Sequence, residues 1–141
     1  MPLTAKLFAA LLLVPASASA ADALVYASAY TCDANAINQD LVDTCARHFP
    51  ELTQDANDAI ARWRSRNAAK ASLAHDACEA RIEAPESTPA LDDATLSRAQ
   101  LDGMRFDIRA AFQVRAKQEG SGACVEALGQ LANDGSGLDF P

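Results

Sequence analysis

The chain has 141 residues and a formal net charge of −7 at pH 7, a length typical of one small domain. Because a protein that binds nucleic acid must neutralise phosphates with Lys and Arg, this acidic composition argues against nucleic acid as a partner. The same negative charge argues against binding to anionic membrane surfaces.

The first 20 residues have the three parts of a secretory signal peptide. Lys6 supplies a positive charge, residues 7–14 are an apolar run, and Pro15 leads into the small residues ASASAA. We expect cleavage after Ala20. The apolar run is shorter than the roughly 20 residues that cross a bilayer. The sequence therefore predicts an exported protein that is not inserted in a membrane after cleavage.

Residues 21–32 are predicted to form an extended or irregular arm because apolar and small residues partly alternate there, with the first turn of a helix as the alternative. Asp33 is a residue type that is favoured at helix N-caps, so we expect a helix to begin after it. Apolar residues recur every fourth position from Ile37 to Cys45 and give this helix one apolar face. Pro50 is expected to end it.

A second helix is predicted from Thr53 to about Ala84, with Ile60 and Trp63 on its apolar face. Its second half is rich in alanine, the strongest helix former. Asn67 is a mild weak point in the middle. The sequence thus leaves two possibilities, which are one helix of about 30 residues or two helices that bend near Asn67.

Residues 85–89 (PESTP) are predicted to form a loop, and a third helix is predicted from Asp92 or Asp93 to about Gln118. Apolar residues cover a wide arc of this helix, so we expect it to lie at the centre of the fold. They form two neighbouring stripes, which are Leu101, Met104, Ile108, Ala111 and Phe112, and Phe106, Ala110 and Val114. Gly103 inside the helix is expected to mark a close crossing with another helix.

The sequence GSG at 120–122 is expected to end the third helix, and a short fourth helix is predicted from Ala123 to about Asn133. Residues 33–134 would then be one helical domain. Residues 135–141 contain two glycines and a terminal proline and are predicted to be a flexible tail. The expected fold is all-α, a small antiparallel four-helix bundle with short loops.

The four cysteines are Cys32, Cys45, Cys78 and Cys124. An even number of cysteines in a small exported protein predicts two disulfides. The sequence has no C-x-x-C pair, and the cysteines and histidines are not spaced as in known zinc sites. We therefore expect the cysteines to be structural, with no metal and no other cofactor.

The predicted helices restrict how these cysteines can pair. Cys32 and Cys45 flank one helix and would lie about 19 Å apart, whereas a disulfide requires Cα atoms within about 7 Å. This pair is therefore excluded. If the second helix is straight, the bundle favours Cys32–Cys78 and Cys45–Cys124, which is our prediction. A hairpin at Asn67 would instead favour Cys45–Cys78 and Cys32–Cys124.

Two groups of side chains are candidates for binding. Arg62 and Arg66 lie on one strip of the second predicted helix, and Arg105 and Arg109 lie on a similar strip of the third. If the two strips face each other, these four arginines would bind an anionic group; otherwise they form solvated ion pairs with nearby aspartates. Trp63 is the single tryptophan and is expected in the core, with a partner-binding role as the alternative.

The chain resembles a group of small exported bacterial proteins of uncharacterised function. The resemblance rests on Cys45 followed by the Phe49–Pro50 pair, on the motif W-x-x-R-N at 63–67, and on Cys78. It covers about residues 32–81. It implies a helical, disulfide-bonded, exported protein and implies no activity.

The sequence contains no recognisable catalytic constellation, since no G-x-S-x-G motif is present and each cysteine is expected to be bridged. We therefore expect a periplasmic or secreted non-enzymatic protein that acts by protein–protein contact, such as an inhibitor, an immunity-type protein or an envelope accessory protein. Its acidity suits a basic periplasmic or extracellular protein as partner. The alternative is a small helical enzyme or binder of an anionic small molecule.

Overall fold

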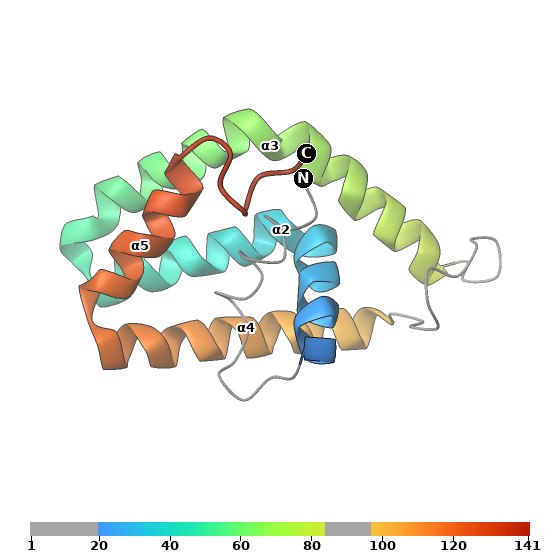
Figure 1. The fold of residues 1–141 in the computed structure, drawn as a ribbon, viewed down its shortest axis with the longest axis horizontal. Coiled ribbons are helices and arrows are strands. Elements are labelled where there is room, and N and C mark those ends of the chain that lie inside the picture. Colours follow the sequence, from blue (N-terminus) through green and yellow to red (C-terminus); the bar gives the residue numbers. More distant parts are fainter. Residues whose placement is uncertain (1–19, 84–96) are drawn as a thin grey trace.

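The computed structural model describes residues 20–83 and 97–141, and within these ranges it is helical with no strand (Figure 1). The elements are α2 (Ala20–His48), the short 3-10 helix η1 (Pro50–Leu52), α3 (Thr53–Glu83), α4 (Arg98–Glu119) and α5 (Ser121–Ala132). The predicted all-α bundle is confirmed. No described helix is both long enough and apolar enough to cross a membrane. Apart from Ala20, the predicted signal peptide lies outside the described residues.

Helix α2 consists of two segments that meet at Asp33, whose φ of −126° and ψ of 30° are not helical. Figure 1 shows the first segment crossing the bundle and the second running along its middle. A helical segment does begin after Asp33, as predicted. The prediction of an extended or irregular arm over 21–32 is wrong, because Ala29 and Cys32 are buried against Leu101 of α4 and this packing outweighs a weak local preference.

The second segment of α2 is the centre of the fold, since α2 packs against α3, α4 and α5. Its buried face carries Ile37, Leu41 and Cys45, as the spacing predicts. Helix α3 continues without interruption through Asn67 and arches over α2 (Figure 1). The single long helix is thus the correct one of the two possibilities for this segment.

The two disulfides are Cys32–Cys78 and Cys45–Cys124, each with a Cα–Cα distance of 5.6 Å. This pairing confirms the prediction that a straight second helix favours. Cys45–Cys124 joins α2 to α5 inside the main core, where both cysteines are fully buried. Cys32–Cys78 joins the bend of α2 to the C-terminal half of α3 beside a smaller apolar cluster.

Helix α4 begins at Arg98, and its N-terminus is closed by a capping box between Ser97 and Gln100. The predicted loop at 85–89 and the predicted start at Asp92 or Asp93 lie outside the described residues. At its other end, Gly120 adopts a φ of 74°, a left-handed backbone that favours glycine. The third predicted helix ends there, as the sequence GSG predicted, but α5 begins at Ser121 and not at Ala123.

Helix α4 lies at the edge of the bundle, so the prediction that it is central is wrong (Figure 1). It buries Leu101, Ile108 and Phe112 on one face only, whereas Phe106 and Val114 of the second predicted stripe are 59% and 53% exposed. No heavy atom outside the local helix would lie within 4 Å of a Cβ at Gly103, so this glycine marks no close crossing either.

Candidate functional site

The C-terminal segment after α5 packs against α2 and α3. Leu138 is only 3% exposed, and its carbonyl oxygen accepts hydrogen bonds from the Tyr30 hydroxyl at 2.8 Å and from Trp63 Nε1 at 2.9 Å. A buried tryptophan N–H and a buried tyrosine O–H both need an acceptor. The prediction of a flexible tail over 135–141 is therefore wrong, because the core supplies two donors that this segment satisfies.

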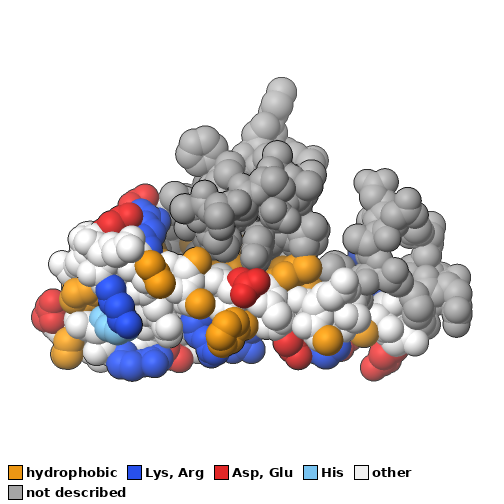
Figure 2. Space-filling view, turned by 90° about the horizontal axis from the view of Figure 1, so that it is seen from below, with side chains coloured by type: hydrophobic (Ala, Val, Ile, Leu, Met, Phe, Trp, Pro, Cys, Tyr) orange, Lys and Arg blue, Asp and Glu red, His pale blue; other side chains and the backbone are white. Residues whose placement is uncertain are grey.

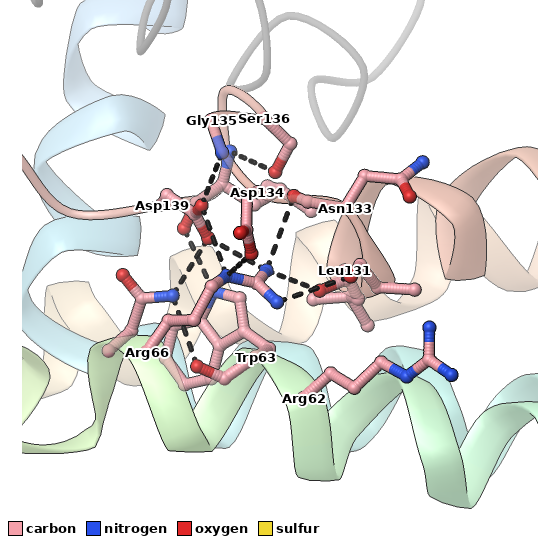
Figure 3. A network of polar contacts seen from close by, with 12 residues as sticks. Arg62, Trp63, Arg66, Leu131, Asn133, Asp134, Gly135, Ser136 and Asp139 are labelled. Carbon is pink, nitrogen blue, oxygen red and sulfur yellow. Dashed lines mark hydrogen bonds and ion pairs between the residues drawn. The ribbon is translucent and has the colours of Figure 1, made fainter.

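Arg66 of α3 binds both this segment and the end of α5 (Figure 3). Its guanidinium donates to the carbonyl oxygens of Leu131 at 2.7 Å and Ala132 at 3.2 Å, at the end of α5. It also donates to the carboxylate of Asp139 at 3.0 Å. A cation is favourable at a helix C-terminus, where the last carbonyl groups lack partners within the helix. Arg66 therefore connects α3, α5 and the C-terminal segment.

Asp139 receives further hydrogen bonds from Asn67 Nδ2 and from the backbone N–H of Gly135, both at 2.8 Å. Burial alone would raise the pKa of Asp139, but the hydrogen bonds from Arg66, Asn67 and Gly135 outweigh burial and hold this pKa below its ordinary value. The Asn67 side-chain oxygen in turn accepts from the backbone N–H of Phe140. The three fixed positions of the W-x-x-R-N motif thus all bind the C-terminal segment.

Trp63 itself is fully buried, and its ring contacts Phe140 of the same segment. Its side chain therefore lies in the core, and the alternative in which Trp63 binds a partner has no exposed surface to support it.

The four arginines singled out as a possible anion site do not meet in one pocket. Arg66 is occupied by the C-terminal segment, and Figure 3 shows the Arg62 side chain pointing away from that network. On α4, Arg105 donates to Asp40 of α2 at 2.7 Å, and this hydrogen bond raises the pKa of Arg105. Arg109 lies 5.7 Å from the centre of the Phe106 ring.

A groove of about 400 Å³ lies between α2 and α3 at the bend of α2. The Asp33 side chain is 8% exposed, and it lies 3.3 Å from both His75 Nδ1 and Arg98 Nη1. Ser72 lines the same groove. His75 Nδ1 also lies 3.0 Å from the carbonyl oxygen of Cys32. These contacts hold the bend of α2 against α3 and α4.

A second groove, of about 250 Å³, lies between α3 and α5. Its lining includes Leu52 and Leu128, and Val125 at its side is 57% exposed. Asp55 and Asp58 of α3 are exposed on the same rim. Arg62 is exposed and lines the same groove, which therefore offers apolar surface next to two carboxylates and one guanidinium.

Sequence reasoning did not single out Val125 or Asp139. The signal for Val125 is present in the sequence, since it lies off the inward stripe that was predicted for the fourth helix. The only signal for Asp139 is that it stands between two apolar residues, Leu138 and Phe140. Its partners lie about 70 positions earlier in the chain, and no local pattern identifies them.

In the parts of the chain that the structure describes, no group of three or more His, Cys, Asp or Glu side chains is placed to hold a metal ion. Comparison of the chain with models of known protein families, with curated protein sequences and with solved structures gave no match. What the α3–α5 groove can bind therefore has to follow from its own residues.

Proposed function

We propose that this is an exported, non-enzymatic protein that binds a basic periplasmic or extracellular protein through the α3–α5 groove. An inhibitor, an immunity-type protein and an envelope accessory protein would all act in this way. The predicted signal peptide and the two disulfides support export, since disulfides persist mainly in oxidising compartments. Nine arginines against three lysines, together with abundant alanine, favour a bacterial source.

The observation that carries the proposal is the exposed Val125 beside Asp55 and Asp58 in the α3–α5 groove. Protein interfaces combine an apolar centre, which supplies binding energy, with a polar rim, which supplies specificity. Here the centre would receive an apolar side chain of the partner, and the carboxylates would pair with its Lys or Arg. The net charge of −7 would also speed the encounter with a basic protein.

Two of the four candidate arginines give no support to the alternative of an anionic small molecule. Arg66 and Arg105 are already neutralised by Asp139 and Asp40 of the same chain. An anion would have to displace these carboxylates, which are held by several hydrogen bonds.

The test is a capture experiment with three matched baits, using an extract of the cell envelope and culture medium of the source organism. The baits are the wild-type protein, Val125→Glu in the groove, and Asp76→Lys, an exposed residue of α3 outside the groove. We expect a basic protein that the wild type and Asp76→Lys retain and that Val125→Glu loses. Its binding to the purified wild type, measured by calorimetry, should weaken as salt rises.

Asp58→Lys provides a second groove variant, in which the rim charge is reversed and the apolar centre is intact. It should slow association more than it speeds dissociation. The proposal is wrong if every captured protein binds Val125→Glu as well as the wild type, or if the protein that is lost is acidic.

A further inference from the structure

The outward face of α4 exposes two large apolar side chains that no other described element covers. The Arg109 guanidinium of the same helix lies 5.7 Å from the centre of the Phe106 ring. Phe106 and Val114 are 59% and 53% exposed and lie on the side of α4 opposite to the buried Ile108. They are eight positions apart, so they are two turns apart on one stripe. Figure 2, which views the molecule from the α4 side, shows hydrophobic side chains exposed between acidic and basic ones.

Small residues separate these two large side chains. Ala110 lies midway between Phe106 and Val114 on the stripe, and Gly103 lies one turn before Phe106. The space around Gly103 is open, since a Cβ there would meet no heavy atom beyond its own helix within 4 Å. A second helix can therefore approach the backbone of α4 closely along this stripe.

The stripe is complementary to itself when α4 is reversed. A two-fold axis at Ala110 that pairs α4 with an antiparallel α4 brings Phe106 of one copy beside Val114 of the other. The same rotation places Asp102 opposite Gln118, one position from Lys117, and both charged side chains are exposed. Asp102 also lies 3.5 Å from Arg98 of its own helix. Each contact occurs twice, as in any isologous interface.

We propose that this face of α4 is an interface between two copies of the protein, which pair as an antiparallel α4–α4 dimer centred on Ala110. Its apolar contacts are Phe106 against Val114, and its ion pairs are Asp102 with Lys117. A single pair of helices is a small interface, so the dimer should be concentration-dependent. The interface shares no residue with the α3–α5 groove. A variant that disrupts the dimer should therefore leave binding at the groove unchanged, and the reverse should also hold.

Cysteine crosslinking tests the position of the axis. In Ala110→Cys the two new thiols would meet across the dimer, and mild oxidation should join the chains. Leu73→Cys is the matched control, because Leu73 is 71% exposed on α3 and lies outside the proposed interface. We expect a crosslinked dimer for Ala110→Cys at concentrations where Leu73→Cys remains monomeric. Equal crosslinking of the two variants would rule out the proposed axis.

Analytical ultracentrifugation tests the contacts without any crosslink. Phe106→Lys should raise the dissociation constant of the dimer by about tenfold or more, since it places two charges in the apolar centre. Asp102→Lys and Lys117→Asp should each weaken the dimer by a smaller factor, and the double variant should restore it. A monomeric mass at every concentration, or no recovery in the double variant, would overturn the proposal.

Discussion

The guanidinium of Arg66 donates a hydrogen bond to the carboxylate of Asp139 at 3.0 Å, across 73 positions of the sequence. Their side chains are 20% and 13% exposed. Around this pair the C-terminal segment closes over Trp63, whose Nε1 donates to the carbonyl oxygen of Leu138. The last residues of the chain are therefore part of the core, and their loss should affect the folding of the whole domain.

Replacing Asp139 with Asn should lower the free energy of unfolding by about 1.5–3 kcal/mol, the usual range for a hydrogen bond to a charged group. The change keeps the shape of the side chain but leaves Arg66 without the negative charge it faces. Urea unfolding followed by circular dichroism would measure the loss.

Asp134→Asn is the matched control for this substitution. Asp134 also lies near Arg66, at 3.1 Å, but its side chain is 89% exposed. A solvated ion pair of this kind contributes at most about 1 kcal/mol. If both variants lose the same stability, the segment is not held by Asp139.

Acid should weaken the same contact. Because the pKa of Asp139 is lower in the folded than in the unfolded chain, its contribution is complete above the ordinary aspartate pKa of about 3.9 and is lost as pH falls through the folded value. The stability gap between the wild type and Asp139→Asn should therefore shrink as pH falls below about 4. Unfolding midpoints of both proteins at several pH values would check this, and a constant gap would contradict it.

Tyr30 should make the stability of the fold depend on pH in the opposite direction, with the loss at alkaline instead of acid pH. Burial raises the pKa of Tyr30 well above its ordinary value, and hydrogen bonding from Asn38 only partly offsets burial. The folded chain thus resists ionisation of the tyrosine, and stability should fall as pH rises above about 10.

Tyr30→Phe isolates this effect from the other groups that titrate in alkali. It should cost about 1 kcal/mol near neutral pH, because it removes the hydrogen bond to the carbonyl oxygen of Leu138. Between about pH 8 and pH 10.5 it should then lose less stability than the wild type. Parallel losses in the two proteins would show that Tyr30 is not the group responsible.

The sequence predicted the helices and the disulfides because both follow from local periodicity and length. An apolar residue at every fourth position places Ile37, Leu41 and Cys45 on one face, and 31 consecutive helical residues in α3 carry Cys78 back to Cys32. The alanine-rich second half of α3 was sufficient to favour a straight helix.

The segments 21–32 and 135–141 were predicted wrongly for a common physical reason, which is that their partners are distant in the sequence. Tyr30 and Leu138 are 108 positions apart, and the Tyr30 hydroxyl donates a hydrogen bond to the carbonyl oxygen of Leu138. Similarly, the sequence shows that α4 has a wide apolar arc. Which part of that arc is buried depends on where the neighbouring helices lie. Ile108, which lines a small cavity together with Ile37 and Leu41 of α2, is buried, whereas Phe106 is exposed.

The two disulfides should differ in their resistance to reduction. Cys45 and Cys124 are both 0% exposed inside the main core, so a thiol reaches them only when the domain opens. Cys78 is partly exposed, and Cys32 lines the groove at the bend of α2. Under native conditions, a mild reductant should therefore open Cys32–Cys78 first.

Trapping the new thiols with an alkylating reagent and mapping them by mass spectrometry would identify the bridge that opened. The chain-entropy model assigns each bridge about 4 kcal/mol, because both close loops of tens of residues. The order in which the two disulfides are reduced should therefore depend on how easily the reductant reaches each of them and not on loop length. In Cys32→Ser/Cys78→Ser the remaining bridge should resist the same reductant, because the main cluster around Trp63 does not include Cys32 or Cys78. If Cys45–Cys124 in that variant is reduced as readily as Cys32–Cys78 is in the wild type, the prediction is wrong. The bridge Cys32–Cys78 would then be required to keep the main core closed.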